Sequence, residues 1–150
     1  MNASIEVYNP MSAYNNAINK LEKKGIRATK QRRILAKLIF DKGKRHISAE
    51  NLFDEVKKED RKISMATIYN TLKQFTNLGL IREIVVDKNK SLYDTNNKPH
   101  YHLYIEDEGK VHDIPTNNIN LDLPSIPACL NLHNIDVIVR VRSLKDNKKS

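Results

Sequence analysis

The sequence predicts an α+β protein in two parts, because helical and strand-like patterns occupy different stretches of the chain. Residues 29–79 carry three helical patterns in succession, and residues 80–95 carry the pattern of a β-hairpin. From residue 96 onward the patterns are mainly those of strands. We therefore expect a first domain over residues 1–95, of which 1–20 are partly flexible. A small α/β domain follows over residues 96–150 and ends in a polar tail from residue 144.

The composition of the 150-residue chain excludes several classes of protein. Hydrophobic residues make up 39%, enough for a buried core, but no run of 18 apolar residues occurs. The first 15 residues lack the basic and then apolar order of a signal peptide. We therefore expect a cytoplasmic protein with no membrane partner. The single cysteine, Cys129, excludes an internal disulfide and any zinc site built on paired CxxC motifs.

Positive charge is concentrated in the first part of the chain. The net charge is +8, and residues 1–90 hold 19 Lys and Arg against 10 Asp and Glu, whereas residues 91–150 hold 7 against 8. Eleven basic residues fall between Lys20 and Arg45. A nucleic acid is a natural partner, because Lys and Arg release condensed counterions when they contact phosphates. A solvated charged surface is the alternative.

Each of the three helical patterns follows a residue that can cap a helix. Thr29 precedes a helix that stops near Gly43, Ser48 precedes the second helix, and Ser64 precedes a third helix that ends at Gly79. The third helix has one apolar face. Its other face carries small, hydroxyl, amide and basic side chains, namely Ala66, Thr67, Tyr69, Asn70, Lys73 and Asn77. Such side chains suit base edges and phosphates.

A hairpin with basic residues at its tip follows the third helix. Residues 80–87 and 91–95 are predicted to be its strands, with Lys88-Asn89-Lys90 as the turn. Three helices and a basic hairpin are typical of the winged helix-turn-helix, which places its last helix in the major groove of DNA. We therefore expect a sequence-specific DNA-binding transcription regulator. The alternative is a non-specific nucleic-acid-binding winged-helix protein without metal regulation. An enzyme is not expected, because the four glycines form no phosphate-cradling loop.

The second part is predicted to contain three strands and one short helix. Strands are expected over residues 101–106, 110–114 and 135–142, with a tight turn at Glu108-Gly109 and a helix through Ala128, Cys129 and Leu130. A segment of 55 residues with these elements has little core of its own. We therefore expect it to pair with a second copy, so that the homodimer matches the paired half-sites of a DNA operator.

Histidines in the second part are candidate metal ligands. His100 and His102 stand two residues apart on a predicted strand, so both imidazoles leave the same face. A two-residue loop at Glu108-Gly109 would place Tyr104 opposite Asp113 and set that aspartate on the same face. A slip of one residue would exchange Asp113 for His112. Ordinary polar strand positions are the alternative.

Ordered blocks of sequence between about Leu21 and Arg142 carry a family resemblance. They are GIRATKQR at 25–32, HISAE at 46–50, ISMATIYNTL at 63–72, LYDT at 92–95 and HYH at 100–102. With these blocks the chain resembles the ferric uptake regulator (Fur) superfamily. Through FT at 75–76, VD at 86–87 and DVIVRVR at 136–142, it most closely resembles the iron response regulator (Irr) subgroup. The resemblance implies a dimeric, DNA-binding, iron-responsive regulator and leaves open whether it represses or activates.

The resemblance also implies which residues contact DNA. Arg27 would reach the minor groove or the backbone. Apart from the resemblance, the basic residues Lys30 and Arg32 are expected to bind all duplexes alike. The DNA-contacting positions on the third helix would be Ser64, Ala66, Thr67, Tyr69 and Asn70. Typical Fur proteins have Arg where this chain has Asn70. Because Asn pairs with adenine and Arg with guanine, we expect an operator that differs from the usual Fur box.

One regulatory metal site of the family takes its ligands from positions that correspond to His46, Asp94, His100, His102 and Asp113. The two carboxylates are Asp where the family commonly has Glu. Such a set, without a thiolate, suits Fe2+, Mn2+ or Zn2+. A helix-entry residue bonded to the backbone is the alternative for His46.

Other sites of the family are absent or altered in this sequence. The second His/carboxylate site is broken by Pro99, Tyr101 and Ile135, and the cysteine zinc site is missing. The resemblance to Irr proteins also implies that this protein binds haem, for which His100, Tyr101 and His102 are the candidate ligands.

Overall fold

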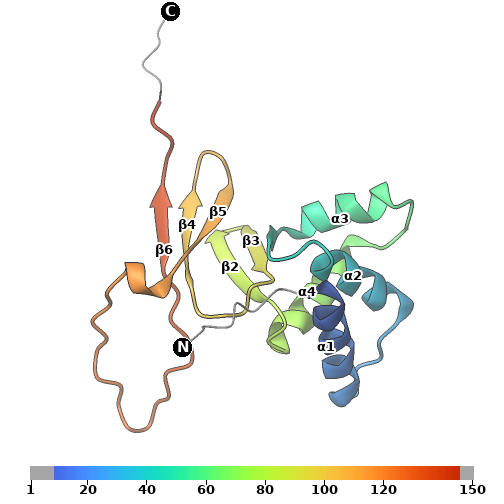
Figure 1. The fold of residues 1–150 in the computed structure, drawn as a ribbon, viewed down its shortest axis with the longest axis horizontal. Coiled ribbons are helices and arrows are strands. Elements are labelled where there is room, and N and C mark those ends of the chain that lie inside the picture. Colours follow the sequence, from blue (N-terminus) through green and yellow to red (C-terminus); the bar gives the residue numbers. More distant parts are fainter. Residues whose placement is uncertain (1–8, 146–150) are drawn as a thin grey trace, which may run out of the picture. The chain divides into compact units, whose positions relative to one another are not determined.

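A computed structural model describes residues 9–145 of the protein (Figure 1). The chain divides into two units, and the boundary lies between Asn97 and Lys98, two residues after the predicted boundary at Thr95. Among the described helices none is long and apolar enough to cross a membrane. Most of the predicted polar tail, and the first eight residues of the segment predicted to be partly flexible, lie outside the described residues.

The first unit contains the three predicted helices. Thr29, Ser48 and Ser64 each accept a hydrogen bond from the backbone N–H three residues later, at 3.2, 3.0 and 3.1 Å respectively. These bonds satisfy donors that have no partner inside the helix, which explains why the helices begin where they do. The helices that they cap are α2 (Lys30–Phe40), α3 (Ala49–Lys58) and α4 (Met65–Asn77).

One helix of the first unit, α1 (Pro10–Lys23), was not predicted. It occupies much of the segment that was expected to be partly flexible. The side chain of Asn9 accepts the N–H groups of Met11 and Ser12 and so caps the helix. Ala17 and Leu21 are fully buried, so α1 contributes to the core. An Asn followed by a Pro is a start signal from which this helix could have been predicted.

The helices surround an apolar core and lead into a small sheet. The sheet has the strand order β1-β3-β2, all antiparallel, and its strands are β1 (His46–Ile47), β2 (Arg82–Asp87) and β3 (Lys90–Asp94). The predicted hairpin is therefore confirmed as β2 and β3, and β1 is an unpredicted addition. The largest fully buried side chains come mainly from the helices and include Leu21, Leu35, Ile39, Leu52, Ile68, Leu72 and Phe75.

Gly79 turns the chain from α4 into this hairpin. Its φ is +71°, its N–H donates to the Thr76 carbonyl at 3.0 Å, and the N–H of Leu80 donates to the Phe75 carbonyl at 2.9 Å. This pair of bonds closes the helix with a left-handed residue, a conformation that glycine adopts at little cost. The predicted end of the third helix is thus confirmed.

The second unit is built on a mixed sheet with the order β5-β4-β6. β4 pairs antiparallel with β5 and parallel with β6. The fold is therefore α+β, as predicted. The elements of this unit are β4 (Tyr101–Ile105), β5 (Lys110–Ile114), the 3-10 helix η1 (Thr116–Asn118) and β6 (Ile138–Val141).

The helix predicted through Ala128, Cys129 and Leu130 is wrong. The chain forms a single turn there, in which the N–H of Leu130 donates to the Pro127 carbonyl at 2.9 Å. Pro124 and Pro127 have no backbone N–H to donate, and one hydrogen bond does not offset the cost of nucleating a helix.

The register of β4 and β5 differs from the predicted one by two residues. His102 lies opposite Asp113, and Tyr104 lies opposite Val111 instead of Asp113. The turn uses four residues, because the N–H groups of Glu108 and Gly109 both donate to the carbonyl of Ile105, at 3.3 and 2.8 Å. A shift of two residues leaves every side chain on its original face. Asp113 therefore shares a face with His100 and His102, as predicted.

Candidate metal centre and DNA-binding surface

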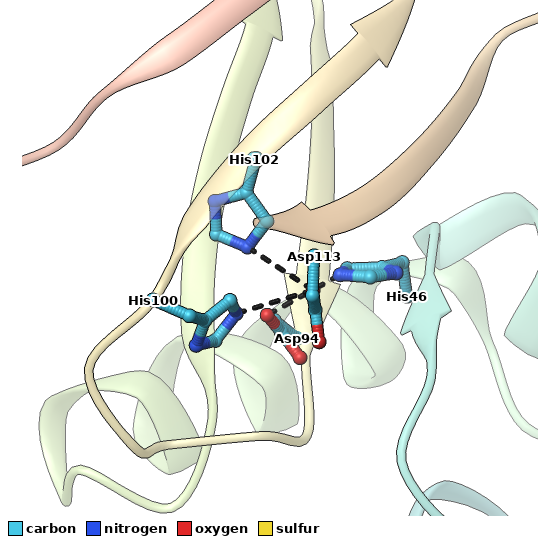
Figure 2. A group of neighbouring side chains, drawn as sticks. All are labelled: His46, Asp94, His100, His102 and Asp113. Atoms are coloured by element: carbon cyan, nitrogen blue, oxygen red, sulfur yellow. Dashed lines mark ion pairs between the residues drawn. The ribbon is translucent and has the colours of Figure 1, made fainter. Parts of the chain in front are cut away.

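Cross-strand pairing brings the first two predicted metal ligands together. His46 in β1 is the register partner of Asp94 in β3. Nε2 of His46 lies 3.3 Å from Oδ2 of Asp94 (Figure 2). The other carboxylate oxygen accepts the N–H of Asn96 at 2.8 Å, and Asp94 is fully buried. These contacts hold a carboxylate and an imidazole side by side in the first unit.

The residues next to this pair are tied to each other and to α3. The N–H of Arg45 donates to Oγ1 of Thr95 at 2.9 Å, and the N–H of Thr95 donates to the Arg45 carbonyl at 3.1 Å. The guanidinium of Arg45 donates two bonds to the Glu55 carboxylate, at 2.7 and 2.8 Å. Sequence reasoning did not find these supporting residues, because nothing in the pattern of the chain links positions 45, 55 and 95.

A second set of predicted ligands lies in the second unit: His100 directly precedes β4, His102 lies in β4 and Asp113 lies in β5. Oδ1 of Asp113 lies 3.2 Å from Nε2 of His100 and 3.8 Å from Nε2 of His102 (Figure 2). Nδ1 of His100 contacts the carbonyl of Lys98. Because a carbonyl only accepts, Nδ1 carries the proton, and in the neutral imidazole Nε2 then offers its lone pair to a metal ion.

The donor atoms of this set suit a divalent metal ion. The candidate ligand atoms of His100, His102 and Asp113 lie within 4.8 Å of one another. Two imidazoles and one carboxylate without a thiolate are a set that Fe2+, Mn2+ and Zn2+ accept, and the same combination with open positions is typical of non-haem Fe2+ sites. The protein therefore has a His/Asp site for a divalent ion.

The three residues predicted for haem do not share a face. Tyr101 begins β4 between His100 and His102, so its side chain leaves the opposite side of the strand. The hypothesis of a haem site at these residues gains no support from their arrangement.

The predicted DNA-binding residues of α4 lie mostly at the surface. Ser64, Ala66, Tyr69 and Asn70 are exposed, whereas Thr67 is half-buried. The hydroxyl of Thr67 lies 2.9 Å from that of Ser64, so both belong to the cap of the helix. This face of α4 offers hydroxyl, amide and phenol groups to a partner.

Of the three basic residues predicted to contact DNA, two are exposed and one is half-buried. Arg27 and Lys30 are exposed before and at the start of α2. Arg32 is half-buried, and its Nε donates to Oε1 of Gln74 on α4 at 3.0 Å. Its guanidinium also donates to the carbonyl of Arg27. Arg32 therefore links α2 to α4 in this structure.

An acidic residue that sequence reasoning missed contacts the exposed face of α4. The hydroxyl of Tyr69 donates to Oε1 of Glu50, in the first turn of α3, at 2.9 Å. The pKa of Glu50 is lowered by its own backbone N–H at the helix start and by the bond from Tyr69. The bond to Glu50 in turn raises the pKa of Tyr69. The pair therefore consists of a carboxylate anion and a protonated phenol.

A family model and a curated relative both match most of this chain. The model of the ferric uptake regulator family matches residues 23–141. The peroxide-responsive repressor PerR of Staphylococcus aureus (strain Mu50 / ATCC 700699) is 29% identical over 117 residues, which cover 78% of each chain. The resemblance predicted that iron response regulators would be most similar, whereas these relatives are peroxide-responsive repressors.

Solved structures share the fold. The ferric uptake regulator of Vibrio cholerae has a TM-score of 0.65 and is 21% identical, and the match covers 84% of this chain and 98% of that one. A zinc-bound manganese uptake regulator has a TM-score of 0.59 and is 26% identical, with 85% and 98% covered.

Proposed function

Since the chain belongs to the ferric uptake regulator family, whose members are metal-responsive DNA-binding transcription regulators and not enzymes, we propose that one divalent ion controls its affinity for a double-stranded DNA operator. The ligands proposed are His46, Asp94, His100, His102 and Asp113. The observation that carries this proposal is the convergence of two imidazoles on one carboxylate oxygen in β4 and β5.

Each set of ligands is incomplete by itself. The pair of His46 and Asp94 offers two ligand atoms, and the set on β4 and β5 offers three, whereas metal ions of this class take four to six. Asp94 and His100 are separated by only five residues, so the chain between them spans at most about 20 Å. The second set is therefore always at high effective concentration relative to the first.

Binding of one ion by both sets gives a physical route from metal to DNA affinity. The ion would tie the DNA-binding unit to the second unit. The arrangement of the two units that binds the ion more tightly then becomes more populated, in proportion to the ratio of the affinities for the ion. In this scheme the ion acts through its coordination by the protein ligands. Fe2+, Mn2+ and Zn2+ are all consistent with the donor set, and the zinc-bound manganese uptake regulator supports the last two.

The proposed signal is iron, following the resemblance to the iron response regulators. A response to peroxide is the second candidate, which the name of the Staphylococcus aureus relative favours. Operator complexes formed with Fe2+ without oxygen distinguish the two. If iron is the signal, chelation changes DNA affinity and added peroxide does not. Loss of DNA binding with peroxide, at constant iron, favours the second candidate.

Haem binding is tested with the same purified protein. Absorption spectra of the protein and of a His102→Ala variant are compared as haem is added. Identical spectra remove His102 from consideration as a haem ligand.

The protein is proposed to bind DNA as a homodimer formed through its second unit. Family members bind operators as dimers. Large apolar side chains of this unit are exposed in the single chain: Leu121, Leu123, Ile126, Leu130 and Leu132. Exposed apolar side chains in one segment are typical of an interaction surface. Sedimentation of the wild type and of a Leu130→Glu, Leu132→Glu variant tests this, and an unchanged dimer fraction would exclude the segment.

On DNA, α4 is proposed to enter the major groove with Ser64, Ala66, Thr67, Tyr69 and Asn70. Arg27 and Lys30 contact the backbone. Asn70 is proposed to read adenine through its amide. Replacement by Arg is expected to move the preference at one operator position from adenine to guanine. Arg32 is also proposed to contact the backbone, and its bond to Gln74 holds α4 against α2.

The experiment that tests the metal site is selection of binding sites from random duplex DNA with and without Mn2+. The wild type is expected to select paired half-sites with an affinity that depends on the metal. His102→Ala is expected to lose that dependence. His112→Ala is the matched control, because His112 is exposed and lies on the other face of β5. A His102→Ala variant that keeps the full metal dependence would overturn the proposal.

A further inference from the structure

Tyr69 is exposed on α4, yet the proton of its hydroxyl is already engaged. The side chain is 45% exposed, and its hydroxyl donates to Oε1 of Glu50 at 2.9 Å. Glu50 lies in the first turn of α3, where the helix dipole favours a negative charge. The pKa of Glu50 is lowered and that of Tyr69 is raised, so the donor and the acceptor keep these roles at neutral pH.

This bond decides what the Tyr69 hydroxyl can offer to DNA. A phenol hydroxyl has one proton to donate and lone pairs to accept. Its proton is committed to a carboxylate, and such a charge-assisted bond is about twice as strong as a neutral one. Only the lone pairs therefore remain for a base. In the major groove adenine offers an amino donor beside its N7 acceptor, and cytosine offers an amino donor alone. Guanine and thymine offer only acceptors, which are N7 and O6 of guanine and O4 of thymine.

We propose that Glu50 is a specificity-determining residue of DNA recognition, because it fixes the Tyr69 hydroxyl as a hydrogen-bond acceptor that selects a base with an exocyclic amino group. The inference rests on the proposed function, in which α4 lies in the major groove. Guanine and thymine are disfavoured at the contacted position, since their acceptor atoms face the lone pairs of the hydroxyl. Glu50 acts through Tyr69 and needs no contact with DNA, so it is a positioning residue.

A purely structural link between α3 and α4 makes a different prediction. In that case loss of the bond would lower stability and weaken binding to all duplexes alike. Under the proposal, Glu50→Ala frees the proton of Tyr69, which can then turn to guanine or thymine. Selectivity is lost at one position and kept at the others. Glu50→Gln retains an amide oxygen as acceptor without the charge, so it is expected to keep part of the preference.

The test is binding-site selection from random duplex DNA by the full chain with Mn2+. The wild type is expected to prefer adenine or cytosine over guanine or thymine at one position by about tenfold. Glu50→Ala is expected to reduce this preference to less than about twofold. Tyr69→Phe affects the same position, and the double variant adds nothing further. Asp54→Ala removes an exposed charge from the same helix and serves as the control, with wild-type preferences throughout.

Three outcomes separate the inference from the function on which it rests. A wild type that selects no motif overturns both. A wild-type motif that Glu50→Ala leaves unchanged overturns the inference alone. So does a guanine or thymine preference at the position that Tyr69→Phe affects. Circular dichroism of each variant verifies that it is folded, and Tyr69→Phe keeps the inference testable if Glu50→Ala does not fold.

Discussion

The ion pair of Arg45 and Glu55 connects the segment before His46 to α3, and Glu55→Gln breaks it with almost no change in size. The two side chains are 19% and 18% exposed, and the guanidinium donates to both carboxylate oxygens at 2.7 and 2.8 Å. Lys42 adds a third contact to the carboxylate at 3.0 Å. In the variant one carboxylate oxygen becomes an NH2 group, which cannot accept a hydrogen bond from Arg45.

The expected cost lies between that of an exposed pair and that of a buried one. Exposed pairs contribute about 0.2–1 kcal/mol, and loss of one partner of a buried pair costs about 3–5 kcal/mol. With roughly a fifth of each side chain exposed, and one of the two bonds retained, we expect the free energy of unfolding to fall by about 2 kcal/mol. This shifts the urea midpoint by about 1 M.

The pH dependence of this effect has a defined sign. Burial raises the pKa of Glu55, but the hydrogen bonds from Arg45 and Lys42 outweigh burial, and the pKa is lowered overall. A carboxyl with a lowered pKa in the folded state contributes stability above its unfolded pKa, which is about 4.3 for Glu. That contribution is lost as the pH falls through the folded value. The difference between wild type and variant is therefore largest near pH 7 and shrinks below about pH 4.3.

Urea unfolding followed by circular dichroism at pH 7 and at pH 3 measures both quantities. Glu59→Gln is the control, because Glu59 is about half exposed and its ion pair with Arg61 spans 3.7 Å. The control is expected to change stability by less than about 0.5 kcal/mol. Equal midpoints for wild type and Glu55→Gln at pH 7, or a difference that persists undiminished at pH 3, would refute the reasoning.

Three further changes have defined outcomes. Gly79→Ala is expected to cost about 1–2 kcal/mol in urea unfolding because φ is +71°, and the cost is backbone strain alone because no atom beyond the two neighbouring residues lies within 4 Å of the added Cβ; an unchanged midpoint contradicts the strain. Thr95→Val removes the acceptor of the Arg45 N–H beside two proposed ligands and is expected to weaken Mn2+ binding, measured against a competing chelator, by about 10-fold or more. Replacement of Lys88 and Lys90 by Ala is expected to reduce the salt slope of DNA binding by about 2, and an equal slope would exclude the hairpin tip from phosphate contact.

Features with a local physical cause could be predicted from the sequence. Thr29, Ser48 and Ser64 cap the predicted helices because each satisfies a backbone donor only three residues away. The common face of His100 and His102 follows from the alternation of a strand. Asp113 joined them although its register was wrong by two residues, because an even shift preserves the face.

The tertiary structure decided what depends on distant parts of the chain. The family resemblance named His46 and Asp94 as ligands of one site, but no residue pattern linked them. They meet through a two-residue strand, too short for any alternation to reveal, whose partner is nearly fifty residues away in sequence. The Arg45, Glu55 and Thr95 contacts and the bond from Tyr69 to Glu50 likewise join elements that only packing brings together. A single turn stands at Ala128 where a helix was predicted, because the segment makes too few hydrogen bonds to form a helix. The sequence by itself determined which side chains share a face of a strand or helix, because that follows from the backbone period. The contacts between elements were decided by the tertiary structure, because packing brings together residues that are distant in the sequence.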